Sequence, residues 1–275
     1  MNQTFNINRW WLLVTRHWIE NRKRYLLSLL AMPGLLLAWF GFSLVIGGHH
    51  PVQENIQYIT YEGGLYIAGS IYASMLFSDL GSRPRAINFL SVPASHFEKL
   101  LCAILYGVVL FFFLYTLAFY VADIPMVKIG NALGYERFKT DHFTDEIFVG
   151  DRVFNVFVYN ERFHNEGFFY FFIAYFPVQS VFLLGSVYFA RYSFIKTTIA
   201  LLLLWLLFFI YIRVLYPADW YWHNLVEWSR YNKNGEMNVI RLSPWIENFL
   251  GYLFKYSIPV ILWVITYFRL KEKEI

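Results

Sequence analysis

The chain has 275 residues, of which 58% are hydrophobic and only 15% are charged. A soluble domain averages about 25% charged residues, so this composition excludes an ordinary soluble protein. The net charge of +4 does not indicate a nucleic-acid partner, because the basic residues flank apolar runs instead of forming one patch.

Six apolar runs divide the chain and decide its fold class. Each is long enough for a helix, rising about 1.5 Å per residue, to cross a hydrocarbon core about 30 Å thick. The runs cover approximately residues 25–46, 60–78, 100–121, 168–190, 197–215 and 249–270. No tandem repeat or flexible linker separates them. We therefore predict an all-α polytopic membrane protein with a single transmembrane domain, residues 1–275, and no room for an added ATPase domain.

Basic residues on alternate connectors predict the orientation. Lys and Arg occur before the first run, between the second and third, between the fourth and fifth, and after the last. The connector Gly47–Ile59 has none. The positive-inside rule therefore places both termini in the cytoplasm. We expect a multi-pass protein of a bacterial inner membrane, with membrane lipids as its surroundings.

The segment Asn6–Glu20, ahead of the first run, is amphipathic. Its aromatic and basic residues suit a helix lying in the membrane interface, with indole rings at the acyl boundary and guanidinium groups among the headgroups. The residues that carry this pattern are Trp10, Trp11, Arg16 and Trp18. Two interpretations stay open: a simple anchor, or an elbow helix that also touches a cytoplasmic partner.

The connector Asp79–Lys99 carries the most distinctive local pattern. Ser95 and Glu98 have the spacing of a capping box, in which each side chain bonds the backbone amide of the other residue. Pro93, just before this cap, stops any preceding helix from running through. We therefore predict a short helix or turn at about Ile87–Val92, ahead of the third span.

This connector is either a well-capped link or a docking site for a soluble partner. The second interpretation rests on apolar residues that lie between basic ones on a cytoplasmic loop. The candidate partner-docking residues are Arg83, Arg85, Phe89, Leu90, Pro93, Ser95 and Glu98.

The two long outer connectors predict small elements of secondary structure. In residues 123–167, the β-prone runs Glu146–Val149 and Val153–Tyr159 favour a β-hairpin. In residues 217–248, apolar residues at i, i+4 and i+7 favour a short amphipathic helix.

Sequence motifs for chemistry are absent from the chain. There is no GxxxxGK(S/T) phosphate loop, no HExxH and no GxSxG. We therefore expect no catalytic residue, cofactor or metal, and no enzyme activity in this chain. Polar residues inside the spans are scarce, and those that could form an intramembrane site are Gln179, Ser180 and Lys255. Lys255 also suits a snorkelling role near the outer end of the last span.

The chain resembles the membrane subunits of type-2 ABC exporters, in particular the permease-like proteins of Bacteroidetes bacteria. The likeness lies in the amphipathic start, the six runs with both ends inside, and the segment Leu90–Lys99. That segment reads LSVPASHFEK where the family has an LPASxxEK pattern, with Val92 in place of the leucine. The long connector between the third and fourth runs departs from the family, whose largest outer segment lies between the last two spans.

The resemblance implies export driven by ATP. It implies a second permease subunit, identical or different, and separate ABC ATPase subunits that push on a short coupling helix. In this chain the coupling helix corresponds to about Arg83–Glu98, and the elbow helix to Asn6–Glu20. The transported substrate is not implied.

Two other functions stay open. The unusual outer connectors suit a membrane-embedded sensor or scaffold that binds a ligand or an envelope partner. An intramembrane enzyme is the third alternative, and it needs polar residues that converge at one depth.

Overall fold

The computed structural model describes residues 5–46, 52–141, 150–155, 167–215, 220–222, 227–231, 237–241 and 243–273. This part of the chain is predominantly helical. Its α-helices are α1 (Ile7–Ile46), α2 (Glu54–Met75), α3 (Arg83–Leu90), α4 (His96–Ile104), α5 (Phe111–Asp141), α6 (Gly167–Tyr188), α7 (Ser193–Leu215) and α8 (Pro244–Glu272). A 3-10 turn, η1 (Ser78–Gly81), precedes α3, and a π-helical turn, η2 (Leu105–Leu110), joins α4 to α5.

Five of the six predicted apolar runs lie largely within one of these helices, and the run 100–121 continues from α4 through η2 into α5. Three described segments are long and apolar enough to cross a membrane: Ile7–Ile46, His96–Tyr135 and Ser193–Tyr211. The prediction of a helical membrane protein agrees with this finding. That α2, α6 and α8 also cross the membrane stays a prediction.

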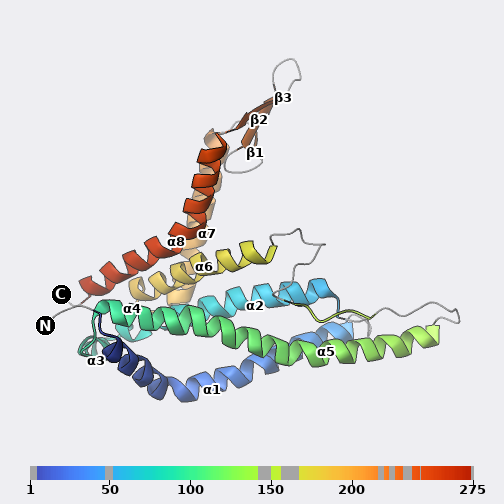
Figure 1. Ribbon diagram of the computed structural model, residues 1–275, viewed down its shortest axis with the longest axis horizontal. Helices are drawn as coiled ribbons and strands as arrows, with labels where there is room; N and C mark the ends of the chain where they lie inside the picture. Colours follow the sequence, from blue (N-terminus) through green and yellow to red (C-terminus); the bar gives the residue numbers. More distant parts are fainter. Residues whose placement is uncertain are drawn as a thin grey trace.

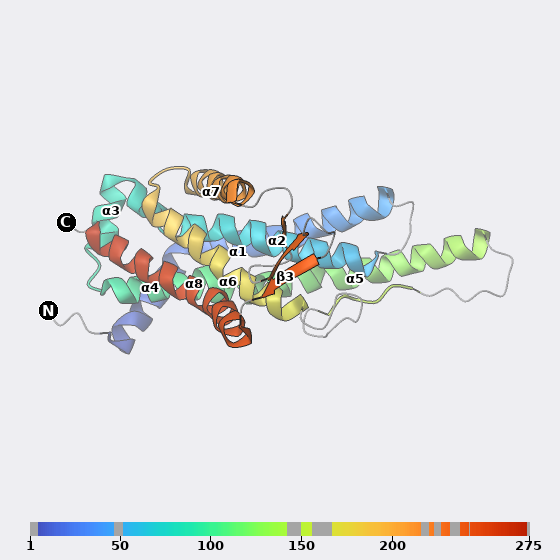
Figure 2. The same ribbon diagram turned by 90° about the horizontal axis from the view of Figure 1, so that it is seen from above.

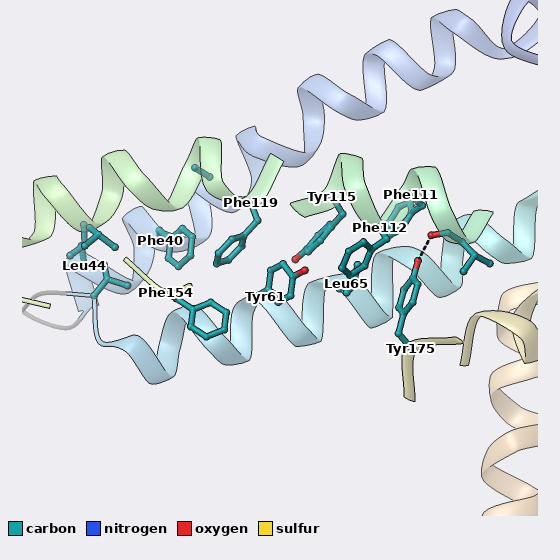
Figure 3. Packing of buried hydrophobic residues seen from close by; sticks show 14 residues of the cluster. Phe40, Leu44, Tyr61, Leu65, Phe111, Phe112, Tyr115, Phe119, Phe154 and Tyr175 are labelled. Atoms are coloured by element: carbon teal, nitrogen blue, oxygen red, sulfur yellow. Dashed lines mark hydrogen bonds between the residues drawn. The ribbon is translucent and has the colours of Figure 1, made fainter. Parts of the chain in front are cut away.

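The helices α1, α2, α5 and α6 pack into an elongated bundle with an aromatic core (Figures 1 and 2). In the core, the ring of Tyr61 on α2 lies 5.0 Å from that of Phe119 on α5, measured between centroids (Figure 3). The hydroxyl of Tyr175 on α6 donates to the carbonyl oxygen of Val108 at 3.0 Å, which joins α6 to η2. Small residues let α2 approach its neighbours, because Gly64 lies against the Tyr115 hydroxyl and Gly69 against the Gln179 amide.

The helix α5 extends well past the predicted end of the third span. It includes Pro125 and runs to Asp141, so the first part of the connector 123–167 is helical rather than a loop. Residues 150–155 contain no strand. The remainder of the predicted hairpin lies outside the described residues.

The described part of that connector is fastened to the bundle at two places. The Gln57 side chain donates to the carbonyl oxygen of Arg152 at 3.0 Å and accepts from the amide of Phe154 at 2.6 Å. The Asn131 side chain exchanges hydrogen bonds with the backbone of Asp151 at 2.8 and 3.0 Å. Phe154 is thereby seated in the aromatic core.

The helix α7 and the first part of α8 project away from the bundle (Figure 1). Only 6% of the most apolar 18-residue stretch of α7 is buried. Beyond them lies a small antiparallel sheet in the order β1 (Trp220–Trp222), β2 (Glu227–Tyr231) and β3 (Met237–Arg241). The predicted amphipathic helix in residues 217–248 is therefore wrong. Its aromatic and β-branched residues also suit strands, and the pairing of three strands decides in their favour.

The start of α1, the end of α8 and all of α3 lie at the same end of the bundle (Figures 1 and 2). This is the arrangement that the predicted orientation requires. That this end faces the cytoplasm stays a prediction.

Candidate docking site at the α3 end of the bundle

The helix α3 is short and begins earlier than predicted. Pro84 lies in its first turn, where a missing amide hydrogen costs nothing. The Ser91 amide closes the helix by donating to the carbonyl oxygen of Ile87 at 2.9 Å. The prediction of a helix at Ile87–Val92 was therefore right about its existence and wrong about its register, because the proline favours a start at Arg83.

The predicted capping box at the start of α4 is confirmed. The Ser95 hydroxyl accepts from the Glu98 amide at 3.2 Å, and the Glu98 carboxylate accepts from the Ser95 amide at 2.8 Å. The Glu98 side chain is completely buried. A buried carboxylate needs further hydrogen-bond donors besides the Ser95 amide.

Arg9 of α1 is the main partner of this carboxylate. Its Nε atom lies 2.8 and 3.0 Å from the two oxygens of Glu98, and its Nη2 atom lies 2.8 Å from Oε1. The backbone amide of Asn6 adds a bond at 2.9 Å. Charge-assisted, forked contacts of this kind are among the stronger hydrogen bonds in proteins. The first turn of α1 is thus fastened to the first turn of α4.

Lys99 fastens α3 to the same place. Its side chain is buried, and its Nζ atom donates to the carbonyl oxygen of Leu90 at 3.1 Å. The ammonium group also lies 5.4 Å from the ring centre of Phe89, within cation–π range. Phe89 in turn packs edge-on against Phe77 at 6.0 Å. The inner face of α3 is therefore held by α4 and by Phe77, which lies between α2 and η1.

The outer face of α3 is exposed and combines charge with one apolar residue. Arg83 and Arg85 are exposed, and Arg85 lies 4.0 Å from Asp79 in a loose surface pair. Ile87 is 67% exposed. By contrast, Phe89 and Leu90, which the sequence favoured as docking contacts, are half-buried.

Ile87 was missed as a docking candidate, although a signal was present. It lies four residues after Arg83, so the two share a face once the helix begins at Arg83. Pro93 is exposed beyond the end of the helix, and Ser95 and Glu98 act in the cap. We define the α3 docking face as three exposed residues of α3: Arg83 and Ile87 on one side of the helix, and Arg85, two residues from each of them, on another side.

The predicted interfacial helix is the first part of α1 and is continuous with the first apolar run. Its tryptophans do not share one face: Trp10 is half-buried, whereas Trp11 and Trp18 are exposed. Arg16 pairs with Glu20 at 2.7 Å on the surface.

Of the three predicted intramembrane polar residues, Gln179 and Ser180 have described side chains. Gln179 and Ser180 are completely buried in α6, and the Ser180 hydroxyl donates to the carbonyl oxygen of Phe176 at 2.7 Å. The Gln179 amide has no hydrogen-bond partner among the described residues. The side chain of Lys255 lies outside the described residues.

A buried carboxylate that sequence reasoning missed lies on α5. Asp123 is completely buried, and neither of its oxygens has a hydrogen-bond partner among the described residues. The sequence placed it at the start of an outer loop. Its spacing from Phe119 and Val127 was the available signal, because residues four apart share one helix face. Within the part of the chain described here, no three His, Cys, Asp or Glu residues are placed to hold a metal ion.

Comparison with known proteins assigns no family. The chain matches no family model, no curated protein and no solved structure. The functional interpretation therefore depends on the geometry of the α3 end.

Proposed function

We propose that this chain is the membrane subunit of an ATP-driven exporter and that α3 docks on a separate ABC ATPase subunit. One observation carries the proposal. A short helix with an exposed basic and apolar face is joined, through buried charged contacts, to two long apolar helices. ATP hydrolysis would belong to the partner.

The contacts of α3 give a route for mechanical coupling. A displacement of α3 would act on Lys99 through Leu90 and Phe89, and hence on the start of α4. The neighbouring Glu98 would transmit this displacement to Arg9 and α1. Both helices continue into the aromatic core, so a push at α3 would change the packing of the bundle.

The exposed helix α7 supports the expectation of a second permease subunit. Its apolar surface is almost wholly outside the bundle of this chain. In a membrane such a surface is covered by lipid or by another helix. A paired subunit, identical or different, would cover part of it.

Co-purification in mild detergent tests the proposal. The unaltered chain should bring down an ATP-binding subunit, and the triple variant Arg83→Glu, Arg85→Glu, Ile87→Asp should lose at least tenfold of that association. The matched control, Arg191→Glu with Lys196→Glu, removes two exposed basic residues, Arg191 from the short connector between α6 and α7 and Lys196 from the first turn of α7. Undiminished association in the triple variant, or an equal loss in the control, would overturn the docking assignment.

A membrane-embedded sensor or scaffold is the second candidate. It is favoured by the sheet β1–β3, which lies beyond the projecting parts of α7 and α8 (Figure 1). Capture of an envelope protein that depends on residues 220–241, with no ATPase present, would support this function over export.

A further inference from the structure

An apolar cavity of about 220 Å³ lies between α1, α2 and the junction of η2 with α5. Its lining includes Trp18, Tyr25, Leu26, Leu29, Tyr72 and Leu114. The cavity reaches the surface of the bundle, since Leu26 is 51% exposed and Leu114 is 39% exposed. A hydrocarbon chain in the bilayer would therefore meet an open apolar groove.

Stacked aromatic rings form part of the wall of this groove. The ring of Tyr25 stacks on that of Tyr106 at 5.7 Å, and Tyr72 stacks on Phe111 at 5.3 Å. Tyr106 and Leu110, which also line the groove, belong to the π-helical turn η2. Such turns are rare and are found frequently at functional sites.

Two further cavities continue the groove toward α3 and become progressively more polar. The nearer one, of about 140 Å³, shares Tyr25 and Tyr72 with the apolar cavity and adds Arg24. The farther one, of about 270 Å³, shares His17 and Asp79 with the nearer one. Taken together, the lining changes from hydrocarbon at one end to charged groups at the other.

The charged end has an excess of basic side chains. The basic residues in the lining of the two polar cavities are Arg16, Arg24, Arg85 and Lys99, and the acidic ones are Glu20 and Asp79. Two of the basic groups are in exposed pairs, Arg16 with Glu20 and Arg85 with Asp79. Exposed pairs contribute little energy, about 0–1 kcal/mol, so an incoming phosphate could compete for these arginines.

We propose that this groove binds an anionic phospholipid-like amphiphile. Its acyl chain would occupy the apolar cavity beside Leu29, and its phosphate would lie near Arg24 and Arg16. Basic pockets between membrane helices are typical sites for anionic headgroups. The further statement that such a molecule is the exported cargo, entering sideways at the α3 end, rests on the proposed function. The binding itself does not.

Photo-crosslinking of the full chain in phosphatidylcholine nanodiscs tests the site. The probe is phosphatidylglycerol with a diazirine in its acyl chain, and adducts are mapped by mass spectrometry. Unlabelled phosphatidylglycerol should reduce adducts on residues 25–32 and 106–114 at least fivefold. Phosphatidylcholine should not do so. Adducts on α7, whose apolar surface lies almost wholly outside the bundle and the groove, should fall only by dilution.

Matched variants separate the two ends of the groove. Leu29→Trp should fill the apolar cavity and remove the saturable adducts, whereas Leu27→Trp, at a residue that is 70% exposed and outside the lining, should not. Arg24→Gln should weaken competition by phosphatidylglycerol at least threefold. Arg22→Gln, at an exposed residue outside the lining, should leave it unchanged.

Three outcomes would overturn the site. They are groove adducts that are no more saturable than those on α7, equal competition by phosphatidylcholine, and full competition by inorganic phosphate alone. The last would mean a free phosphate site without a lipid. A saturable groove in a chain that binds no ATPase would keep the lipid site and remove its role in export. ATPase docking without a saturable groove would keep the proposed function and remove the lipid site.

Discussion

Arg9 and Glu98 join two helices that begin far apart in the sequence. The guanidinium group at the start of α1 donates three hydrogen bonds to a carboxylate 89 residues later, on the first turn of α4. The carboxylate is completely buried, and the amides of Asn6 and Ser95 complete its set of donors. A buried charge is costly unless it is paired and hydrogen-bonded, so this pair fixes where α1 lies on the bundle.

Removing the charge of Glu98 should therefore destabilise the chain. Glu98→Gln keeps the shape but turns an amide NH₂ group toward donors that need an acceptor. We expect a larger loss of unfolding free energy than for Ser95→Ala, which should cost about 1 kcal/mol as the loss of a helix cap. Unfolding of the purified protein in mixed micelles would measure both.

Glu20→Gln is the control for this experiment. It removes the partner of Arg16 in an exposed pair and should change stability by about 0–1 kcal/mol. If Glu98→Gln were as mild as Glu20→Gln, the buried pair would not hold α1 in place.

Close packing of α2 against α6 gives a second prediction. A methyl group at Gly69 would collide with the Gln179 side chain and the Phe111 ring. Overpacking of this kind costs about 1–3 kcal/mol, so Gly69→Ala should be clearly destabilising. Gly63→Ala on the same helix meets no atom within 4 Å and should be neutral or slightly stabilising. Thermal unfolding in detergent compares them, and equal melting temperatures would contradict the packing.

Local sequence signals predicted the parts of this structure that depend on neighbouring residues. Apolar runs gave the long helices, because each run satisfies its own backbone hydrogen bonds within a helix. The capping box at Ser95 and Glu98 was also predictable, since both bonds close within three residues.

Features that depend on distant residues were not predictable in the same way. Nothing near Glu98 in the sequence indicates Arg9, and nothing near Gln57 indicates residues 152–154. The burial of Asp123 follows from α5 continuing past the apolar run, which length and hydropathy did not indicate. Phe89 is half-buried where the sequence favoured an exposed contact, because the start of α3 decides which of its residues face inward.

The tie between Gln57 and residues 152–154 gives a third prediction. Gln57→Ala removes the amide that bonds both the Arg152 carbonyl and the Phe154 amide. Unpaired buried backbone groups cost about 1–3 kcal/mol each, so residues 150–155 should detach readily from the bundle. Hydrogen exchange of this segment should become at least tenfold faster. Gln53→Ala, at an exposed residue just before α2, is the control and should leave the exchange unchanged.

The predicted orientation can be tested with a single new thiol. Cys102 is the only cysteine in the chain and is 5% exposed, so it should react poorly with maleimides in the folded protein. Ile87→Cys places a thiol on the exposed face of α3. In intact cells it should be protected from a membrane-impermeant maleimide, and in inverted vesicles it should be labelled. The unaltered chain gives the background from Cys102. Labelling of Ile87→Cys from outside intact cells would place α3 on the outer side of the membrane, where no ATPase could dock on it.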